Sequence, residues 1–126
     1  MSFTVPILRH GGYLIATIQS ALSDSGVLAL RDDLVDQIGA HRARGIVIDV
    51  AALDVIDSFV ARSLRTIALT ARLRGAETVI VGIQPDVAVA MVQFQLDLDG
   101  LHTALDLEEA LAWLDARPGV RNGRRR

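Results

Sequence analysis

Residues 46–63 read IVIDVAALDVIDSFVARS, in which an apolar run is followed by two aspartates, a serine and the start of a helical pattern. The short apolar run at 46–50 is typical of a central strand that is covered on both faces. From residue 59 to about residue 74 the apolar side chains recur at helical spacing, and Gly75 ends that pattern. A buried strand followed by a helix indicates an α/β domain with a largely parallel sheet.

The rest of the chain continues this alternation. Gly11 and Gly12 separate two β-rich runs, which predicts a hairpin and one antiparallel strand. Pro6 has no N–H, so the first run fits a first or edge strand. The expected strands are 3–9, 13–19, 46–50, 78–83 and a short one near 101–104. The other expected helices begin at 23–25, 86 and 106, and they end at Gly39 or Gly45, near 96 and near 116.

This order predicts an α/β fold with a mixed, mostly parallel central sheet of about four to five strands and about four helices. No repeat or linker divides the chain. We therefore expect one domain over residues 1–117, followed by a disordered, arginine-rich tail at 118–126.

The composition excludes several classes of protein. The chain has 126 residues, of which 51 % are hydrophobic and 22 % charged, as in one compact soluble domain. A formal charge of −2 gives no reason to expect nucleic-acid binding. Cysteine is absent, which excludes disulfides and thiolate metal sites. No apolar run reaches the roughly 18 residues that span a bilayer, and the N-terminus lacks a secretory pattern. We expect a cytoplasmic protein without membrane or nucleic-acid partners.

Motifs for catalysis and for cofactors are also missing. His10, His41 and His102 fall in different predicted elements without metal-ligand spacing, so no metal is expected. Neither phosphate-binding glycine motif occurs, and no serine lies in a GxSxG sequence. The segment 97–100 resembles a calcium loop only faintly, and a solvated turn is favoured. We expect no catalytic residues and no cofactor, and a small enzyme that uses Asp54 and Asp57 as acid and base is a minor alternative.

Ser58 is the most informative polar residue. Either Asp57 or Ser58 is expected to cap the helix, and a serine at a helix N-terminus is open to solvent where backbone N–H groups favour a phosphate. A phosphoryl group would add about −1.5 to −2 charges beside Asp54 and Asp57. A bound protein would then be repelled while the domain stays folded. Phe59 and Arg62 are of types enriched in interfaces, although Phe59 fits the core equally well.

Three segments carry a resemblance to a known family: VPILRHGGYLIATIQ, DVAALDVIDSFVARSL and GAETVIVGIQPDVAVAMV. Together with the order of elements, they make the chain similar to STAS domains from about Val5 to Leu114. Within that family it most resembles the RsbS-like scaffold proteins of the bacterial stressosome. The resemblance implies that Ser58 is the phosphorylated serine. From the character of the residues beside it, we expect Asp54, Asp57, Phe59 and Arg62 to form the partner-binding surface.

The resemblance also implies the partners. An unphosphorylated scaffold of this type assembles with RsbR-type STAS proteins into a homo- or hetero-oligomer and sequesters a serine kinase of the RsbT type. Phosphorylation releases the kinase, and a serine phosphatase acting on Ser58 resets the site. Without an N-terminal sensor module, the chain fits the RsbS type better than the RsbR type. A stand-alone anti-sigma factor antagonist, regulated by the same serine switch, is the alternative.

Some positions stay open or depart from the family. Ser63 or Thr66 could be a second modified position. Phe94 and Gln95 stand where an acidic residue or leucine followed by glycine is expected, which leaves the end of the third helix open. The resemblance implies nothing about the tail after Pro118.

Overall fold

The computed structural model describes residues 5–95 and 101–117 of the chain. Within these ranges, strands and helices follow one another in the predicted order. The strands are β1 (Ile7–His10), β2 (Tyr13–Thr17), β3 (Gly45–Asp49), β4 (Glu77–Val81) and β5 (Leu101–Ala104). The helices are α1 (Asp24–His41), α2 (Ser58–Leu73), α3 (Pro85–Gln93) and α4 (Leu107–Asp115).

The strands form one five-stranded sheet in the order β1-β2-β3-β4-β5. The hairpin strand β1 is antiparallel to β2 and lies at one edge, and the other neighbours are parallel. Gly11 supports the tight hairpin with a positive φ of 60°, a conformation that side chains disfavour. The predicted α/β class, the mostly parallel sheet and the edge position of the first strand are confirmed.

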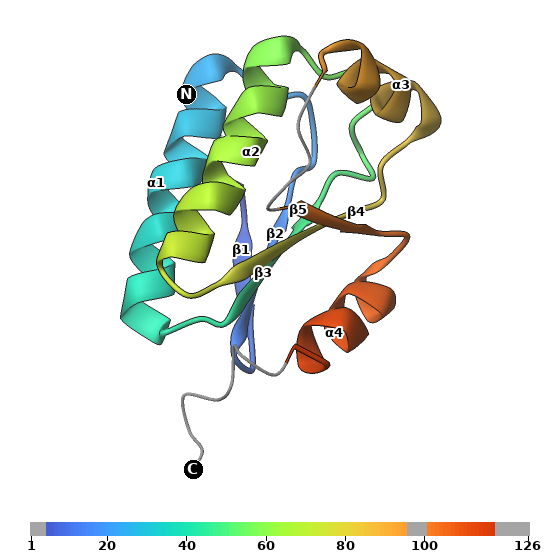
Figure 1. Ribbon diagram of the computed structural model, residues 1–126. Coiled ribbons are helices and arrows are strands. Elements are labelled where there is room, and N and C mark those ends of the chain that lie inside the picture. The colour runs from blue at the N-terminus through green and yellow to red at the C-terminus, as the bar shows by residue number, and fades with distance from the viewer. Residues whose placement is uncertain (1–4, 96–100, 118–126) are drawn as a thin grey trace.

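Helices cover both faces of the sheet (Figure 1). Helices α1 and α2 pack on one face, where Leu14, Ile46 and Ile80 are at most 1 % exposed. Helix α4 packs on the other face over Val47 and Val79. Residues 46 and 47 thus point to opposite cores, which explains why the central strand is an unbroken apolar run. Helix α3 lies apart from both layers, after the carboxyl end of β4.

The predicted end of the first helix was wrong. Helix α1 does not end at Gly39 or Gly45, because it continues to His41 and Arg42 adopts the left-handed C-cap conformation with φ 50°. Gly39 lies inside the helix instead and leaves space for a guanidinium, since a Cβ there would lie 2.8 Å from Arg74 Nη2. Gly45 is the first residue of β3.

The third helix is also shorter than expected. It ends at Gln93, and Gln95 has a φ of 54°, the left-handed conformation for which glycine is favoured. The departure noted at Phe94 and Gln95 therefore marks a helix end made without glycine. Strand β1 starts at Ile7 rather than at residue 3. The expected turn at 97–100 and the expected tail at 118–126 lie outside the described residues.

The three histidines occupy different places. His10 and His41 are exposed, whereas His102 stacks on Trp113 with ring centroids 4.0 Å apart. Among residues 5–95 and 101–117, no three metal-ligating side chains gather in one place. Over the same ranges, no helix has the length and apolar character needed to cross a membrane.

Candidate functional site

Residues 50–57 connect β3 to α2, and the start of this segment is held by hydrogen bonds to the end of β3 and to the loop after β4. The Ala51 N–H donates to the Asp49 carboxylate at 2.9 Å, and the Gln84 side-chain amide donates to the Ala51 carbonyl at 2.7 Å. Gly82 approaches closely as well, because a Cβ there would lie 2.8 Å from the Ala51 Cβ. The start of this segment is therefore held against the loop that follows β4.

The next residues alternate between core and solvent. Leu53 is 3 % exposed, and Ile56 packs against the same core from a half-buried position. Asp54 and Val55 lie between these two anchors, and Val55 is 65 % exposed. The segment thus places a carboxylate and an uncovered valine on the surface directly before α2.

Asp57 is the N-cap of α2, and Ser58 is the first helical residue. The Val60 N–H donates to Asp57 Oδ1 at 2.8 Å, so the aspartate, and not the serine, takes the capping role that the sequence left open between them. The Ser58 side chain is partly exposed, and its hydroxyl forms no hydrogen bond with the described residues. The hydroxyl is therefore available to a group that approaches from solvent.

The N-terminus of α2 is suited to an anion. The first N–H groups of a helix lack acceptors inside it and act as a partial positive charge. The Asp57 carboxylate takes one of these donors, and no residue of the first turn is acidic. A phosphate on Ser58 would lie beside the remaining donors, which is a favourable position for it.

The two other predicted contact residues have different surroundings. Arg62 is exposed and lies four residues after Ser58, which puts both side chains on the same side of the helix. Phe59 is half-buried and packs against the core between the sheet and helices α1 and α2. The question that the sequence left open for Phe59 is thus answered in favour of a core contact, with part of the ring still on the surface.

A small apolar groove beside Asp57 was missed by the sequence analysis. It has a volume of about 170 Å³ and lies between the segment that precedes α1 and the segment that precedes α2. Leu22 contributes from the first segment, and Val55 and Ile56 contribute from the second. The sequence did contain one signal for this groove. Val55 lies between Asp54 and Asp57 in a loop, and an apolar side chain among charged residues in a loop can indicate a contact surface.

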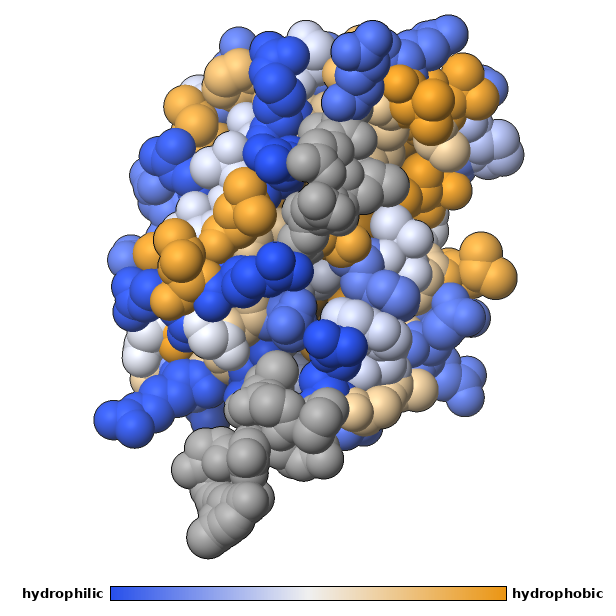
Figure 2. All heavy atoms as spheres, viewed as in Figure 1, coloured by the Kyte–Doolittle hydropathy of each residue, from blue (hydrophilic) through white to orange (hydrophobic). Residues whose placement is uncertain are grey.

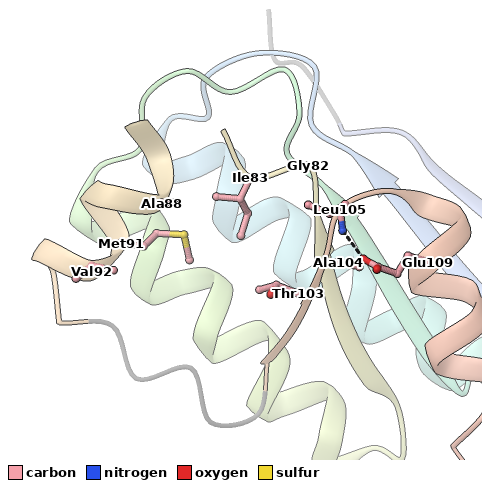
Figure 3. A pocket seen from close by; sticks show the side chains of 9 residues that line it. All are labelled: Gly82, Ile83, Ala88, Met91, Val92, Thr103, Ala104, Leu105 and Glu109. Atoms are coloured by element: carbon pink, nitrogen blue, oxygen red, sulfur yellow. Dashed lines mark hydrogen bonds between the residues drawn. The ribbon is translucent and has the colours of Figure 1, made fainter. Parts of the chain in front are cut away.

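A larger pocket of about 520 Å³ lies between α3, the end of β5 and the start of α4 (Figure 3). Ile83 and Met91 point into it, and Thr103 and Glu109 supply its polar side-chain atoms. The Leu105 N–H already donates to the Glu109 carboxylate at 2.7 Å. Among the described residues, the lining contains no histidine, cysteine or serine, so these residues offer no nucleophile and base in contact.

Ser58 and the two aspartates before it lie at the surface and outside the larger pocket. Asp54 and Asp57 are both exposed, and Asp57 is engaged in helix capping. Neither carboxylate lines the larger pocket. An acid and a base need a shared pocket that excludes water, so this pair is poorly placed for catalysis.

Comparisons with known proteins give the family to which this fold corresponds. A family model described as the STAS domain matches residues 4–110. The RsbT co-antagonist protein RsbRD of Bacillus subtilis (strain 168) is 30 % identical over 115 residues, a match that covers 79 % of this chain. The chain spans only 40 % of the length of that relative.

Solved structures give a closer match in length. The S58E form of RsbS from Moorella thermoacetica is 39 % identical, with a TM-score of 0.78, over 88 % of this chain and 94 % of that one. A chain from the structure described as the molecular architecture of the stressosome, a signal integration and transduction hub, is 36 % identical. Its TM-score is 0.73, and the match covers 87 % of this chain and 96 % of that chain.

Proposed function

The chain belongs to the STAS domain family, and on this premise we propose that it is a non-catalytic, phosphorylation-switched scaffold of a bacterial stressosome. In its unphosphorylated form it holds a serine kinase of the RsbT type, and a phosphate on Ser58 releases that kinase. The similarity to RsbS and to a stressosome chain, each over almost the whole length of the matched protein, supports this class.

The position of Ser58 is the single observation that carries the proposal. Its hydroxyl is partly exposed, has no hydrogen-bond partner among the described residues, and begins a helix whose cap is supplied by the preceding residue. Because Asp57 holds the helix end, modification of Ser58 removes no contact that the fold needs. A kinase can therefore modify the serine without unfolding the domain.

Release of the partner follows from charge. A phosphate adds about −1.5 to −2 charges at neutral pH, next to the exposed carboxylates of Asp54 and Asp57. A partner that covers Val55 and the small groove would have to bury this cluster, and the cost of desolvating it weakens the complex. Arg62 and the N-terminus of α2 stabilise the phosphate locally, so binding changes and the fold does not.

The proposed partners follow from the same premise. RsbR-type STAS proteins would assemble with this chain, which accords with the similarity to an RsbT co-antagonist protein. A serine phosphatase acting on Ser58 would restore the kinase-binding form. The assembly is a homo- or hetero-oligomer in the cytoplasm, and neither nucleic acid nor membrane takes part in it.

A stand-alone anti-sigma factor antagonist is the second candidate. It would use the same serine switch but would act as a small unit. Light scattering after size-exclusion chromatography separates the two, because the scaffold forms a large complex with an RsbR-type protein. A persistent monomer or dimer in that mixture would favour the antagonist.

Replacing Ser58 by aspartate tests the switch. We expect the Ser58→Asp chain to lose retention of its cognate kinase in a pull-down, while its circular dichroism matches that of the wild type. Ala112→Asp is the control, because it adds the same charge at an exposed position of α4, on the opposite face of the sheet. Undiminished binding by Ser58→Asp, or equal loss in Ala112→Asp, would count against the proposal.

A further inference from the structure

The C-terminal end of α2 carries an uncovered apolar side chain between two arginines. Leu73 is 88 % exposed, the highest value among the large apolar side chains of the described residues. Arg72 and Arg74 flank it, are exposed, and form no ion pair with the described residues. Arginines near a helix C-terminus offset the helix dipole, but an exposed leucine between them serves no such purpose. We call residues 72–74 the Arg-Leu-Arg knob.

The larger pocket beside α3 has the complementary apolar character. Met91 and Val92 line it from α3, and Ala104 and Leu105 line it from the end of β5. Val92 is 77 % and Leu105 is 83 % exposed, so the mouth of the pocket is apolar as well. Figure 2 shows hydrophobic surface over α3, separate from a second hydrophobic area near the end of α2. Exposed apolar surface around a cavity is typical of a contact site.

One carboxylate lines this pocket, and two others lie at the starts of the helices that form it. Glu109 lines it, Asp106 caps the neighbouring helix α4, and Asp86 lies in the first turn of α3. All three residues are exposed. The sequence from residue 75 to residue 116 contains no lysine or arginine that could neutralise them. The pocket therefore favours an apolar group that is accompanied by cations.

The knob and the pocket lie at opposite ends of one strand. Helix α2 ends just before β4 begins, whereas Gly82 and Ile83 of the pocket directly follow β4 (Figure 1). A single copy cannot bring the two surfaces together, but two neighbouring copies can. Such a head-to-tail contact repeats from copy to copy, and it produces a closed ring or shell or an open chain of subunits.

We propose that the Arg-Leu-Arg knob of one copy docks into the pocket beside α3 of a second copy. Leu73 enters the apolar cavity, and Arg72 and Arg74 face the carboxylates at the starts of its helices. We choose a second copy as the occupant because the apolar, basic knob and the apolar pocket with acidic residues on its helices are complementary in hydropathy and charge and lie on the same chain. The inference rests on the assembly part of the proposed function and does not depend on the Ser58 switch.

Cysteine cross-linking tests this contact directly, because the chain contains no cysteine of its own. One chain carries Leu73→Cys, and a second carries Ala88→Cys at an exposed position in the pocket lining. After mixing and mild oxidation, we expect a disulfide that joins the two different chains. The matched control pairs Ala88→Cys with Leu8→Cys, which is an exposed leucine of β1. The proposal fails if the control gives the same yield.

Sedimentation of the full chain supplies the second measurement. Burial of a leucine side chain predicts that Leu73→Ala weakens self-association by at least about tenfold, whereas Leu8→Ala leaves it unchanged. If the wild-type chain self-associates and Leu73→Ala does not weaken that self-association, the proposed docking of the knob into the pocket is wrong. The proposal that the chain forms an oligomer would not be affected by this result. A wild-type chain that stays monomeric at all concentrations, alone and with an RsbR-type protein, would overturn both.

A membrane is the other surface that a basic and apolar knob suits. The wild-type chain and Leu73→Ala are therefore mixed with vesicles that contain phosphatidylserine. Our proposal predicts no binding of either chain. Binding that depends on Leu73, together with absence of the cross-link, would assign the knob to lipid and overturn the proposal.

Discussion

The two ends of helix α2 differ in the properties that govern contact with another protein. Its N-terminal end presents the exposed carboxylate of Asp54, the capping Asp57 and the partly exposed hydroxyl of Ser58. Its C-terminal end presents Leu73 between two arginines. Between these ends the helix is anchored in the core by Val60, Ala61, Leu64, Ile67, Ala68 and Ala71.

Because its two ends differ, one rigid helix can take part in two separate contacts, one at Ser58 and one at Leu73. The N-terminal end can change charge, because a helix N-terminus stabilises an added phosphate. Residues 72–74 carry no hydroxyl, so the contact that we propose there would stay constant. The proposed scaffold needs both properties, since it would remain assembled while it releases a bound kinase.

The largest expected effect comes from loosening the helix between its ends. Leu64 is 1 % exposed in the core, so Leu64→Ala should lower the free energy of unfolding by about 2–5 kcal/mol. Urea denaturation measures this change. At low urea, where the variant is still folded, kinase binding should match the wild type. A specific loss of binding in the folded variant would show that the two ends do not act as separate sites on a rigid helix.

A smaller effect is expected from removing the cap at the N-terminal end. Asp57→Ala should cost about 1 kcal/mol, because the Val60 N–H loses its acceptor. The matched change at the other end, Arg74→Ala, should stay within about 0.5 kcal/mol because its side chain is exposed. Thermal unfolding of both variants checks this asymmetry, and equal losses would contradict it.

The smallest expected effect is a change in the free energy of unfolding that has opposite signs when a glutamate is placed at each end of α2. Ser58→Glu should raise the free energy of unfolding by about 0.3 kcal/mol, because a negative charge is favourable at a helix N-terminus. Leu73→Glu should lower it by about 0.3 kcal/mol at the opposite end of the dipole. Chemical denaturation at low ionic strength gives both values, and the difference should shrink in about 1 M salt. Changes of the same sign would refute the dipole argument.

Most of the fold follows from the sequence because the apolar periodicity is strong. The run at 46–50 and the helical spacing after residue 59 identify the buried strand and helix that are observed. Helix ends were harder to predict, because Arg42 and Gln95 adopt left-handed conformations that usually indicate glycine. Gly39 was misleading for a tertiary reason, since it accommodates Arg74 from another helix.

The candidate site was predictable in part for the same reason. A serine between a strand and a helix is recognisable in the sequence, as are the carboxylates beside it. The grooves are formed by segments far apart in the chain, such as Leu22 with Val55, so no local pattern reveals them. The exposure of Leu73 could have been predicted, because Leu73 lies nine residues after Leu64 and therefore on the opposite side of the helix from the buried stripe.

Mapping of the phosphate tests the central claim most directly. The chain is incubated with its cognate RsbT-type kinase and ATP, and the modified residue is identified by mass spectrometry. Our account predicts one phosphate on Ser58 and none on the Ser58→Ala chain. Phosphate on another residue, or equal incorporation into Ser58→Ala, would contradict it.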